Sequence, residues 1–137
     1  MRRAIELARA QHGRTGDNPS VGCVLMSADG RRLSEGATGD GGRPHAEQLA
    51  LTQFDGKLPA GSVAYVTLEP CPLCATAIAF ARLRKVVFGA YDPKGGGVEH
   101  GPRIFAQPTT HHVPEVIGGV MEMECSAILK AFFAERR

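Results

Sequence analysis

Hydrophobic and polar positions change their spacing several times along this chain, and the changes predict alternating helices and strands. Apolar residues at helical spacing indicate a short amphipathic helix over residues 4–11 that ends near Gly13. Two strands are expected at 21–27 and 32–37, and the Asp-Gly pair within 28–30 is typical of a hairpin turn. The first quarter of the chain therefore predicts a helix followed by an antiparallel hairpin.

The rest of the chain continues the change between helical and strand spacing. The expected helices cover about 45–55, 71–84 and 121–137, and the expected strands cover 62–68, 85–90 and 114–117. The strand at 62–68 is apolar on both faces, which is typical of a central strand covered by helices on both sides. This order predicts an α/β protein with three layers, in which a mixed sheet lies between helices.

Length and composition are those of an ordinary globular protein. The chain has 137 residues, of which 43% are hydrophobic and 22% charged. This size suits a single domain, residues 1–137, with a core of its own. No apolar run approaches the ~20 residues of a membrane span, and Glu6 interrupts the apolar segment that a signal peptide would need. We therefore expect a cytoplasmic protein with no membrane partner.

Two short motifs carry the candidate chemistry. His45 and Glu47 belong to a His-Ala-Glu triplet, while Cys71 and Cys74 belong to a Pro-Cys-Pro-Leu-Cys segment. In a cytosolic chain, a Cys-x-x-Cys pair more often binds metal or takes part in redox chemistry than forms a structural disulfide. Cys71 and Cys74 are three positions apart at a predicted helix start, so both thiols can reach one ion. The helix N-terminus favours the ionised form of the thiols. We predict that His45, Cys71 and Cys74 bind Zn²⁺.

Three protein ligands leave one zinc position for water, as in catalytic rather than structural sites. Zinc lowers the pKa of bound water to about 7, so hydroxide is available at neutral pH. Glu47 can take the proton of this water and return it to a departing nitrogen. Release of ammonia requires such a shuttle, because the amide anion is a poor leaving group. The motifs therefore predict a zinc-dependent hydrolase.

A closed structural zinc site is the alternative interpretation of the same motifs. Its fourth ligand would come from Cys23, Cys125, His100, His111 or His112. Cys23 lies in an apolar strand-like run and Cys125 in the last helix, so both are expected to be small buried core residues. A closed site would make the protein a non-enzymatic interaction module.

The His-x-Glu and Pro-Cys-x-x-Cys motifs resemble the signature of the zinc nucleobase deaminases. The resemblance extends over nearly the whole chain and implies a cytidine deaminase-like fold with a five-stranded mixed sheet. It also implies that His45, Cys71 and Cys74 hold zinc and that Glu47 shuttles the proton while a ring amino group is replaced by a carbonyl. Relatives of this kind are commonly dimers or tetramers, so we expect a homodimer.

The two halves of the chain resemble different branches of this superfamily. Residues 13–15, 18–24 and 42–47 resemble the pyrimidine deaminase of riboflavin synthesis, although this chain lacks the longer loop between the cysteines of that enzyme. The resemblance to bacterial tRNA wobble-adenosine deaminase covers residues 65–71, 80–84, 92–96, 111–112 and 132–137. In that family an asparagine after the second strand holds the flipped nucleoside, and Thr38 occupies the equivalent position here.

Four further residues are candidate substrate contacts. Asn18 precedes a proline and so favours an extended backbone, and by the resemblance its amide faces the ring or sugar, with loop capping as the alternative. The backbone N–H of Ala46 can bind a ring carbonyl. Glu69 can contact substrate through its backbone carbonyl or buttress a loop. Asp92 can line the pocket mouth or a dimer interface, and a surface role is equally compatible with the sequence.

The expected activity is that of a hydrolase acting on C–N bonds of cyclic amidines. Its expected substrate is a small nucleobase, nucleoside or diaminopyrimidine-type nucleotide, because the net charge is only +2 and Thr38 replaces the asparagine. The alternative is a tRNA adenosine deaminase that produces inosine. That substrate would require contacts to phosphates, and binding would weaken steeply with salt.

Overall fold

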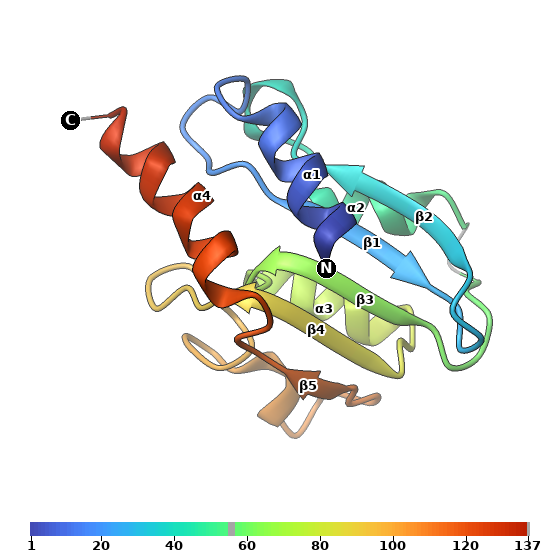
Figure 1. Ribbon diagram of the computed structural model, residues 1–137. Coiled ribbons are helices and arrows are strands. Elements are labelled where there is room, and N and C mark those ends of the chain that lie inside the picture. The colour runs from blue at the N-terminus through green and yellow to red at the C-terminus, as the bar shows by residue number, and fades with distance from the viewer. Residues whose placement is uncertain (55–56, 137) are drawn as a thin grey trace.

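The computed structural model describes residues 1–54 and 57–136, which form one five-stranded sheet with helices on both faces (Figure 1). The strands are β1 (Gly22–Met26), β2 (Arg32–Ala37), β3 (Val63–Leu68), β4 (Lys85–Ala90) and β5 (Glu115–Ile117). The helices are α1 (Arg2–Gln11), α2 (Ala46–Thr52), α3 (Pro72–Phe80) and α4 (Glu122–Ala134). Within the described ranges, each helix is too short or too polar to cross a membrane.

The strand directions decide where the loops meet. The strand order is β2-β1-β3-β4-β5, in which β1 is antiparallel to β2 and β3, whereas β3, β4 and β5 are parallel. The mixed sheet predicted from the sequence is therefore confirmed. As a consequence, β1 begins at the same edge of the sheet at which β2, β3 and β4 end. Four segments come together there: 13–21, 38–45, 69–71 and 91–97.

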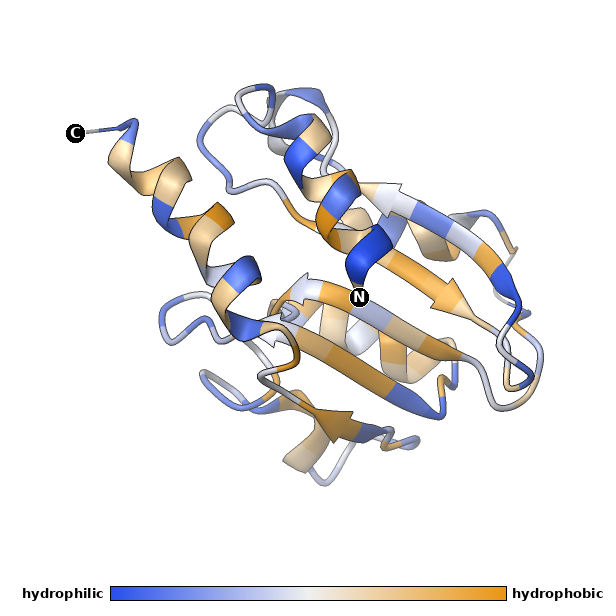
Figure 2. Ribbon diagram, in the orientation of Figure 1, coloured by the Kyte–Doolittle hydropathy of each residue, from blue (hydrophilic) through white to orange (hydrophobic). Residues whose placement is uncertain are grey.

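The core lies on both faces of the sheet, as the apolar strands predict. Helices α1 and α4 cover one face and α2 and α3 the other (Figure 1), and the hydrophobic residues concentrate on the central strands (Figure 2). Leu25, Val66 and Phe88 are fully buried, and burial of such a side chain stabilises the fold by about 1.5–3 kcal/mol. Cys23 and Cys125 are buried at 1% and 3% exposure, which confirms the prediction that both are core residues.

Two glycines allow helices to approach the sheet at backbone distance. A Cβ atom on Gly22 of β1 would overlap the carbonyl oxygen of Ala4 in α1. A Cβ atom on Gly36 of β2 would lie 2.6 Å from the carbonyl oxygen of Ala46, at the start of α2. Close packing at Gly36 therefore fixes the end of α2 that follows His45.

Three of the predicted helices are shorter in the structure than in the sequence analysis. Helix α2 ends at Thr52, so the predicted continuation to 55 is wrong at residues 53 and 54, while residue 55 lies outside the described residues. Helix α3 ends at Phe80 rather than 84 because Arg82 has a φ of 56° and the following Leu83 turns into the core. Helix α4 ends at Ala134, and the predicted end at residue 137 lies outside the described residues.

Candidate metal and active site

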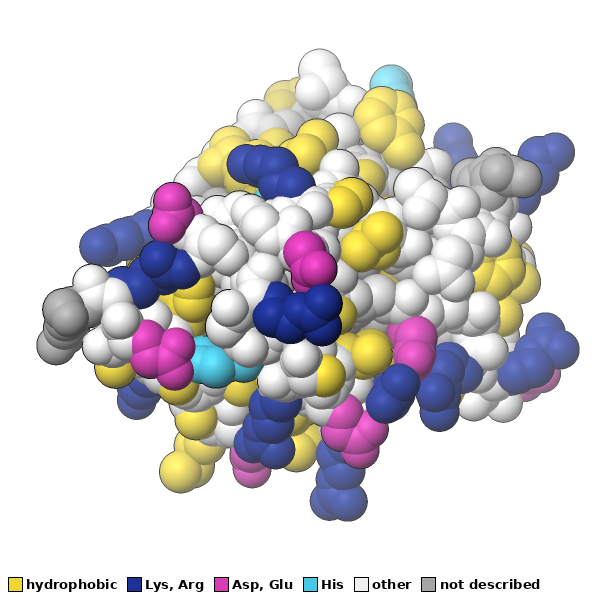
Figure 3. Space-filling model, turned by 90° about the horizontal axis from the view of Figure 1, so that it is seen from above, with side chains coloured by type: hydrophobic (Ala, Val, Ile, Leu, Met, Phe, Trp, Pro, Cys, Tyr) yellow, Lys and Arg dark blue, Asp and Glu magenta, His cyan; other side chains and the backbone are white. Residues whose placement is uncertain are grey.

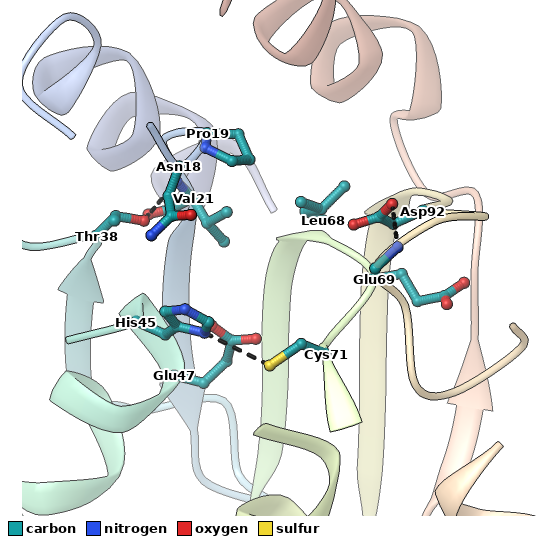
Figure 4. Close-up of a pocket in the computed structure, with 11 residues that line it drawn as sticks. Asn18, Pro19, Val21, Thr38, His45, Glu47, Leu68, Glu69, Cys71 and Asp92 are labelled. Atoms are coloured by element: carbon teal, nitrogen blue, oxygen red, sulfur yellow. Dashed lines mark hydrogen bonds between the residues drawn. The ribbon is translucent and has the colours of Figure 1, made fainter. Parts of the chain in front are cut away.

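A cavity of about 200 Å³ opens at the edge of the sheet where the four segments meet (Figure 4). It is lined by Asn18, Pro19, Val21, Thr38, His45, Glu47, Leu68, Glu69, Cys71, Asp92 and Gly95. This volume is below the ~300–1,000 Å³ of ordinary ligand pockets and suits one small heterocycle rather than a large ligand. The cavity therefore contains most of the residues that the sequence marked as chemically important.

His45 enters the cavity from the start of α2. It is the N-cap residue, with the extended backbone angles φ −69° and ψ 155°, and its backbone N–H donates to Oε1 of Gln48 at 3.0 Å. The first helical turn therefore begins with Ala46 and Glu47. His45 and Glu47 consequently face the same cavity, although only one residue separates them (Figure 4).

Cys71 and Cys74 come from the start of α3, at the matching position on the neighbouring helix. The Nδ1 atom of His45 lies 3.5 Å from Sγ of Cys71 and 3.4 Å from Sγ of Cys74. With zinc–nitrogen bonds of about 2.0 Å and zinc–sulfur bonds of about 2.3 Å, two tetrahedral ligand atoms lie roughly 3.5 Å apart. The spacing of the three side chains therefore fits a single zinc ion.

The electrostatics of this cluster favour a cation. Hydrogen bonds from the Cys74 thiol and from His45 lower the pKa of Cys71 to about 4. The adjacent Cys71 thiolate, together with burial and the charge of Glu47, raises the pKa of Cys74. The prediction that the helix start favours the ionised thiol therefore describes Cys71 on its own, whereas Cys74 needs a positive ion beside it. A bound dication would stabilise both thiolates at once.

Glu47 is buried at 4% exposure, and its carboxylate is directed toward His45 and Cys71 (Figure 4). Burial is the main cause that raises the pKa of Glu47 to about 7. A carboxyl group with such a pKa can both accept and release a proton near neutral pH. Its position next to the candidate metal site is the one that a proton shuttle requires.

Within residues 1–54 and 57–136, no fourth metal ligand lies next to the three candidates. Among the described residues, the side chains that come within 4.8 Å of one another as a potential metal-binding group are His45, Cys71 and Cys74. The sequence alternative of a closed site needed Cys23, Cys125 or one of His100, His111 and His112. The two cysteines are buried in the core, and the histidines lie outside this group. The geometry therefore corresponds to a site with one open position.

Asn18 and Thr38 form one wall of the cavity (Figure 4). Nδ2 of Asn18 donates to the carbonyl oxygen of Gly42 at 3.1 Å, so the amide ties together the 13–21 and 38–45 segments. This capping contact still leaves Oδ1 of Asn18 to accept a hydrogen bond from a ligand. Oγ1 of Thr38 accepts from the backbone N–H of Val21 at 2.9 Å, which commits the hydroxyl to the protein.

The remaining predicted substrate contacts differ in their positions. Asp92 lines the cavity, and its Oδ1 accepts from the backbone N–H of Gly95 at 2.9 Å. Glu69 also belongs to the lining, but its carboxylate is directed away from His45 and is fully buried (Figure 4). The Ala46 side chain is packed in the core and is not part of the lining, so a role for its backbone stays a prediction.

Sequence reasoning did not identify Pro19, Val21, Leu68 and Gly95 as lining residues. Pro19 and Val21 flank or follow the Asn18 candidate, and Leu68 precedes Glu69, so proximity in sequence to a marked residue was their only signal. Gly95 lies in a Gly- and Pro-rich loop whose position over the cavity depends on the strand order. The loop could have been identified if the order of the strands were known, because it follows a strand that is adjacent to β3. This order depends on contacts between distant segments and is not visible in the local sequence.

Comparisons with known proteins agree with this geometry. Residues 1–90 match the family described as the cytidine and deoxycytidylate deaminase zinc-binding region. A tRNA-specific adenosine deaminase of Agrobacterium fabrum is 41% identical over 143 residues, which cover 97% of this chain and 92% of that protein.

Two solved structures are similar over most of the chain. One, from a study of A-to-I editing by tRNA:A34 deaminases, is 40% identical with a TM-score of 0.75 and covers 91% of this chain and 94% of that chain. The other is the Thermotoga maritima diaminohydroxyphosphoribosylaminopyrimidine deaminase/5-amino-6-(5-phosphoribosylamino)uracil reductase, which is 36% identical with a TM-score of 0.81. The match covers 98% of this chain and 39% of the Thermotoga protein.

Proposed function

The chain belongs to the cytidine and deoxycytidylate deaminase zinc-binding family, and on that premise we propose that its substrate is an adenosine within tRNA. Membership confirms the cytidine deaminase-like α/β fold, the zinc cofactor and the hydrolysis of a C–N bond expected from the sequence. The end-to-end similarity to the Agrobacterium tRNA-specific deaminase carries the choice of substrate, because it extends over nearly the whole length of both chains. The product would be inosine.

The residues around the metal site divide the chemical work. His45, Cys71 and Cys74 would hold zinc, which when bound makes water nucleophilic at neutral pH. Glu47 accepts the proton of the attacking water and delivers it to the departing amino nitrogen, so that ammonia leaves as a neutral molecule. Burial of Glu47 limits exchange of this proton with bulk water, and in the metal-free protein it raises the pKa of the carboxyl, which favours acceptance of the proton.

The cavity wall would orient the base that reacts. The volume of about 200 Å³ suits one nucleobase, so an adenine within RNA would have to be turned out of its stack to enter. Oδ1 of Asn18 would accept a hydrogen bond from the ring, since its Nδ2 is held by Gly42. The backbone N–H of Ala46 is the remaining candidate for a ring acceptor, and Asp92 would contact the sugar side of the opening.

Three exposed cations near the cavity suit an RNA backbone. Nη1 of Arg43 lies 3.4 Å from Nε2 of His45, and Lys94 is adjacent to the lining residue Gly95. Arg14 lies in the 13–21 segment, where its Nη2 is 3.1 Å from Oδ2 of Asp40. On the face seen from above, basic and acidic side chains are mixed rather than gathered by sign (Figure 3). We therefore expect a few phosphate contacts around one inserted base, and a moderate dependence of binding on salt.

A small free substrate is the second candidate, and three observations favour it. Thr38 lacks the side-chain amide with which an asparagine would hold a flipped nucleoside, and its hydroxyl already accepts a hydrogen bond from the backbone of Val21. The Thermotoga structure, whose name refers to a diaminopyrimidine compound, has the higher TM-score of the two compared structures. The carboxylates of Glu47 and Asp92 in the cavity are also suited to a ring with several amino groups.

One assay distinguishes the two candidates. The zinc-loaded protein is incubated with an anticodon stem-loop that carries adenosine at the wobble position, and separately with adenosine, AMP, cytidine, guanine and a diaminopyrimidine nucleotide. Ammonia and inosine from the stem-loop, with a KM that rises between 50 and 200 mM salt, would support the tRNA proposal. Turnover confined to a free base or nucleotide, with little effect of salt, would overturn it in favour of the second candidate. Glu47→Gln protein is the blank for contaminating activity.

A homodimer and a cytoplasmic location are further parts of this proposal. Leu73 and Phe80 of α3 are 54% and 79% exposed. Because the two residues are seven positions apart, about two helical turns, they lie on the same face of the helix. Phe80 and Ile104 line a second cavity of about 360 Å³ next to this face, and exposed apolar area of this kind is typical of protein interfaces. Phe80→Ser should shift the mass in solution from dimer to monomer.

Thiolate ligands and a tRNA substrate both suit the reducing cytoplasm.

A further inference from the structure

Glu69 carries a fully buried carboxylate on the segment between β3 and Cys71. Its Oε1 atom accepts a hydrogen bond from Nδ1 of His100 at 2.9 Å, and its buried Oε2 atom has no hydrogen-bond partner in the part of the chain that the structure describes. A buried carboxylate is costly unless it is paired, so His100 supplies the contact that makes this position tolerable. The mechanism described above does not use this pair.

His100 belongs to a long loop, residues 91–103, that crosses over the segment of the first metal-binding cysteine. Backbone N–H of Gly97 donates to the carbonyl oxygen of Pro70 at 2.8 Å, and Ile104 donates to the carbonyl oxygen of Gly97 at 2.8 Å. The same loop contributes Asp92 and Gly95 to the cavity lining. One side of the cavity thus depends on how the 91–103 loop is held against Glu69 and Pro70.

Two glycines let the loop approach closely, Gly96 against the buried carboxylate of Glu69 and Gly97 against the start of α3. A Cβ atom on Gly96 would overlap Oε2 of Glu69, and a Cβ atom on Gly97 would lie 2.5 Å from the backbone nitrogen of Pro72. Both positions are buried. The loop is therefore fitted to Glu69 from two sides, by the His100 hydrogen bond and by the absence of a side chain at Gly96.

The direction of the Glu69 side chain excludes a contact with the reacting ring. Figure 4 shows the carboxylate turned away from His45 and Cys71, on the far side of the backbone that leads to the cysteine. His100 is 35% exposed at its side chain, and its ring meets Tyr91 edge to face with centroids 6.1 Å apart. Neither Glu69 nor His100 is positioned to donate or accept a proton in the reaction.

We infer that Glu69 and His100 are positioning residues that hold the 91–103 loop in the conformation that forms the Asp92 side of the substrate cavity. The pair determines substrate affinity, whereas zinc binding and the chemical step depend on the side chains of His45, Glu47, Cys71 and Cys74. The kinetic part of this inference rests on the proposed deaminase function, and its structural part does not. If the loop were released from Glu69, water would reach the carboxylate, and Asp92 and Gly95 would move from their positions in the cavity lining.

Steady-state kinetics test the inference on zinc-loaded protein. With the best substrate of the panel, His100→Ala should raise KM by about fivefold or more while kcat stays within about twofold and zinc content is unchanged. His100→Gln keeps an N–H donor for Glu69 and should restore much of the loss. Glu99→Gln changes an exposed neighbour in the same loop and serves as the matched control, with kinetics of the parent protein. An unchanged KM in His100→Ala, or a loss of kcat or zinc instead, would overturn the inference.

Amide hydrogen exchange gives a readout that needs no substrate. Peptides covering residues 94–104 should exchange faster in His100→Ala and in Gly96→Ala than in the parent, while peptides from β3 and β4 keep their protection. Because Gly96→Ala acts by steric overlap with Glu69 and leaves His100 intact, agreement between the two variants would support the common cause. If both variants kept the protection of the parent, the inference would be refuted even if no substrate had been identified.

Discussion

Nδ1 of His45 lies 3.4 Å from Sγ of Cys74, although the two residues are 29 positions apart in the chain. Each is held at the first turn of a different helix, and β3 lies between them in the sequence. Because β1 begins where β3 ends, the two helix starts meet at one edge of the sheet. The metal site is therefore a product of the strand order as much as of the two motifs.

Replacement of one thiolate should remove the ion. In Cys74→Ser the hydroxyl is a poor zinc ligand at neutral pH, so zinc content should fall well below one ion per chain and activity should fall at least about 100-fold. Metal analysis after dialysis, together with the ammonia assay, measures both effects. Cys125→Ala alters a cysteine outside the metal-binding group and should keep its zinc. Stoichiometric zinc in Cys74→Ser would contradict the ligand assignment.

Removal of the proton shuttle should separate metal binding from turnover. Glu47→Gln has nearly the shape of the parent side chain but cannot carry the proton, so ammonia release should fall by at least about 100-fold. Zinc content and the thermal midpoint should remain near those of the parent. Both are measured on the same sample as the rate. A variant that retained its rate would show that another group moves the proton.

The contact between α1 and β1 should be sensitive to a single methyl group. In Gly22→Ala the new Cβ would overlap the Ala4 carbonyl oxygen, so the helix must move and stability should fall by about 3 kcal/mol or more. Urea unfolding measures the loss. Gly30→Asn is the control, because the turn at Gly30 has open space and its φ of 86° is one that asparagine tolerates. Equal stability of the two variants would argue against this packing.

An ion pair between α1 and β2 should give a pH-dependent contribution to stability. Arg3 donates to both carboxylate oxygens of Glu35, at 2.7 and 2.9 Å, and this hydrogen bonding lowers the pKa of Glu35. Since the unfolded-state pKa of glutamate is about 4.3, the contribution is present above that pH and is lost as the pH falls through the native pKa.

Glu35→Gln should therefore lower the urea midpoint slightly at pH 7. At low pH, where the carboxyl of the parent is protonated as well, the two proteins should unfold at the same urea concentration. Glu6→Gln is the control, because Glu6 makes a single contact to Arg3 and is largely exposed. A difference between parent and Glu35→Gln that grew toward acid pH would have the wrong sign for this pair.

The three residues of the candidate metal site could be predicted from the sequence because their signals are local. His45, Cys71 and Cys74 have ligand chemistry, and each lies at a predicted helix start, so their assignment as candidate ligands follows from residue type and spacing. The order of helices and strands was predictable for the same reason, because the spacing of apolar residues within each segment indicates whether it forms a helix or a strand.

The remainder depended on contacts between distant segments. The end of α3 was misplaced because burial of Leu83 overrides the helical preference of the residues before it. The substrate wall at Thr38 and the Glu69–His100 pair join segments whose proximity follows from the strand order. No spacing rule marks a glutamate that will be buried against a glycine in a loop 27 positions later.

The close approach of Gly96 to the Glu69 carboxylate gives these two positions a shared evolutionary constraint. A homologue with alanine or a larger residue in place of Gly96 can accommodate the added side chain only if a shorter acid replaces Glu69 or if the loop moves away from this position. Related sequences should therefore vary at the two positions together, and a lineage that loses the glycine should differ in the compounds it accepts rather than in the reaction it performs.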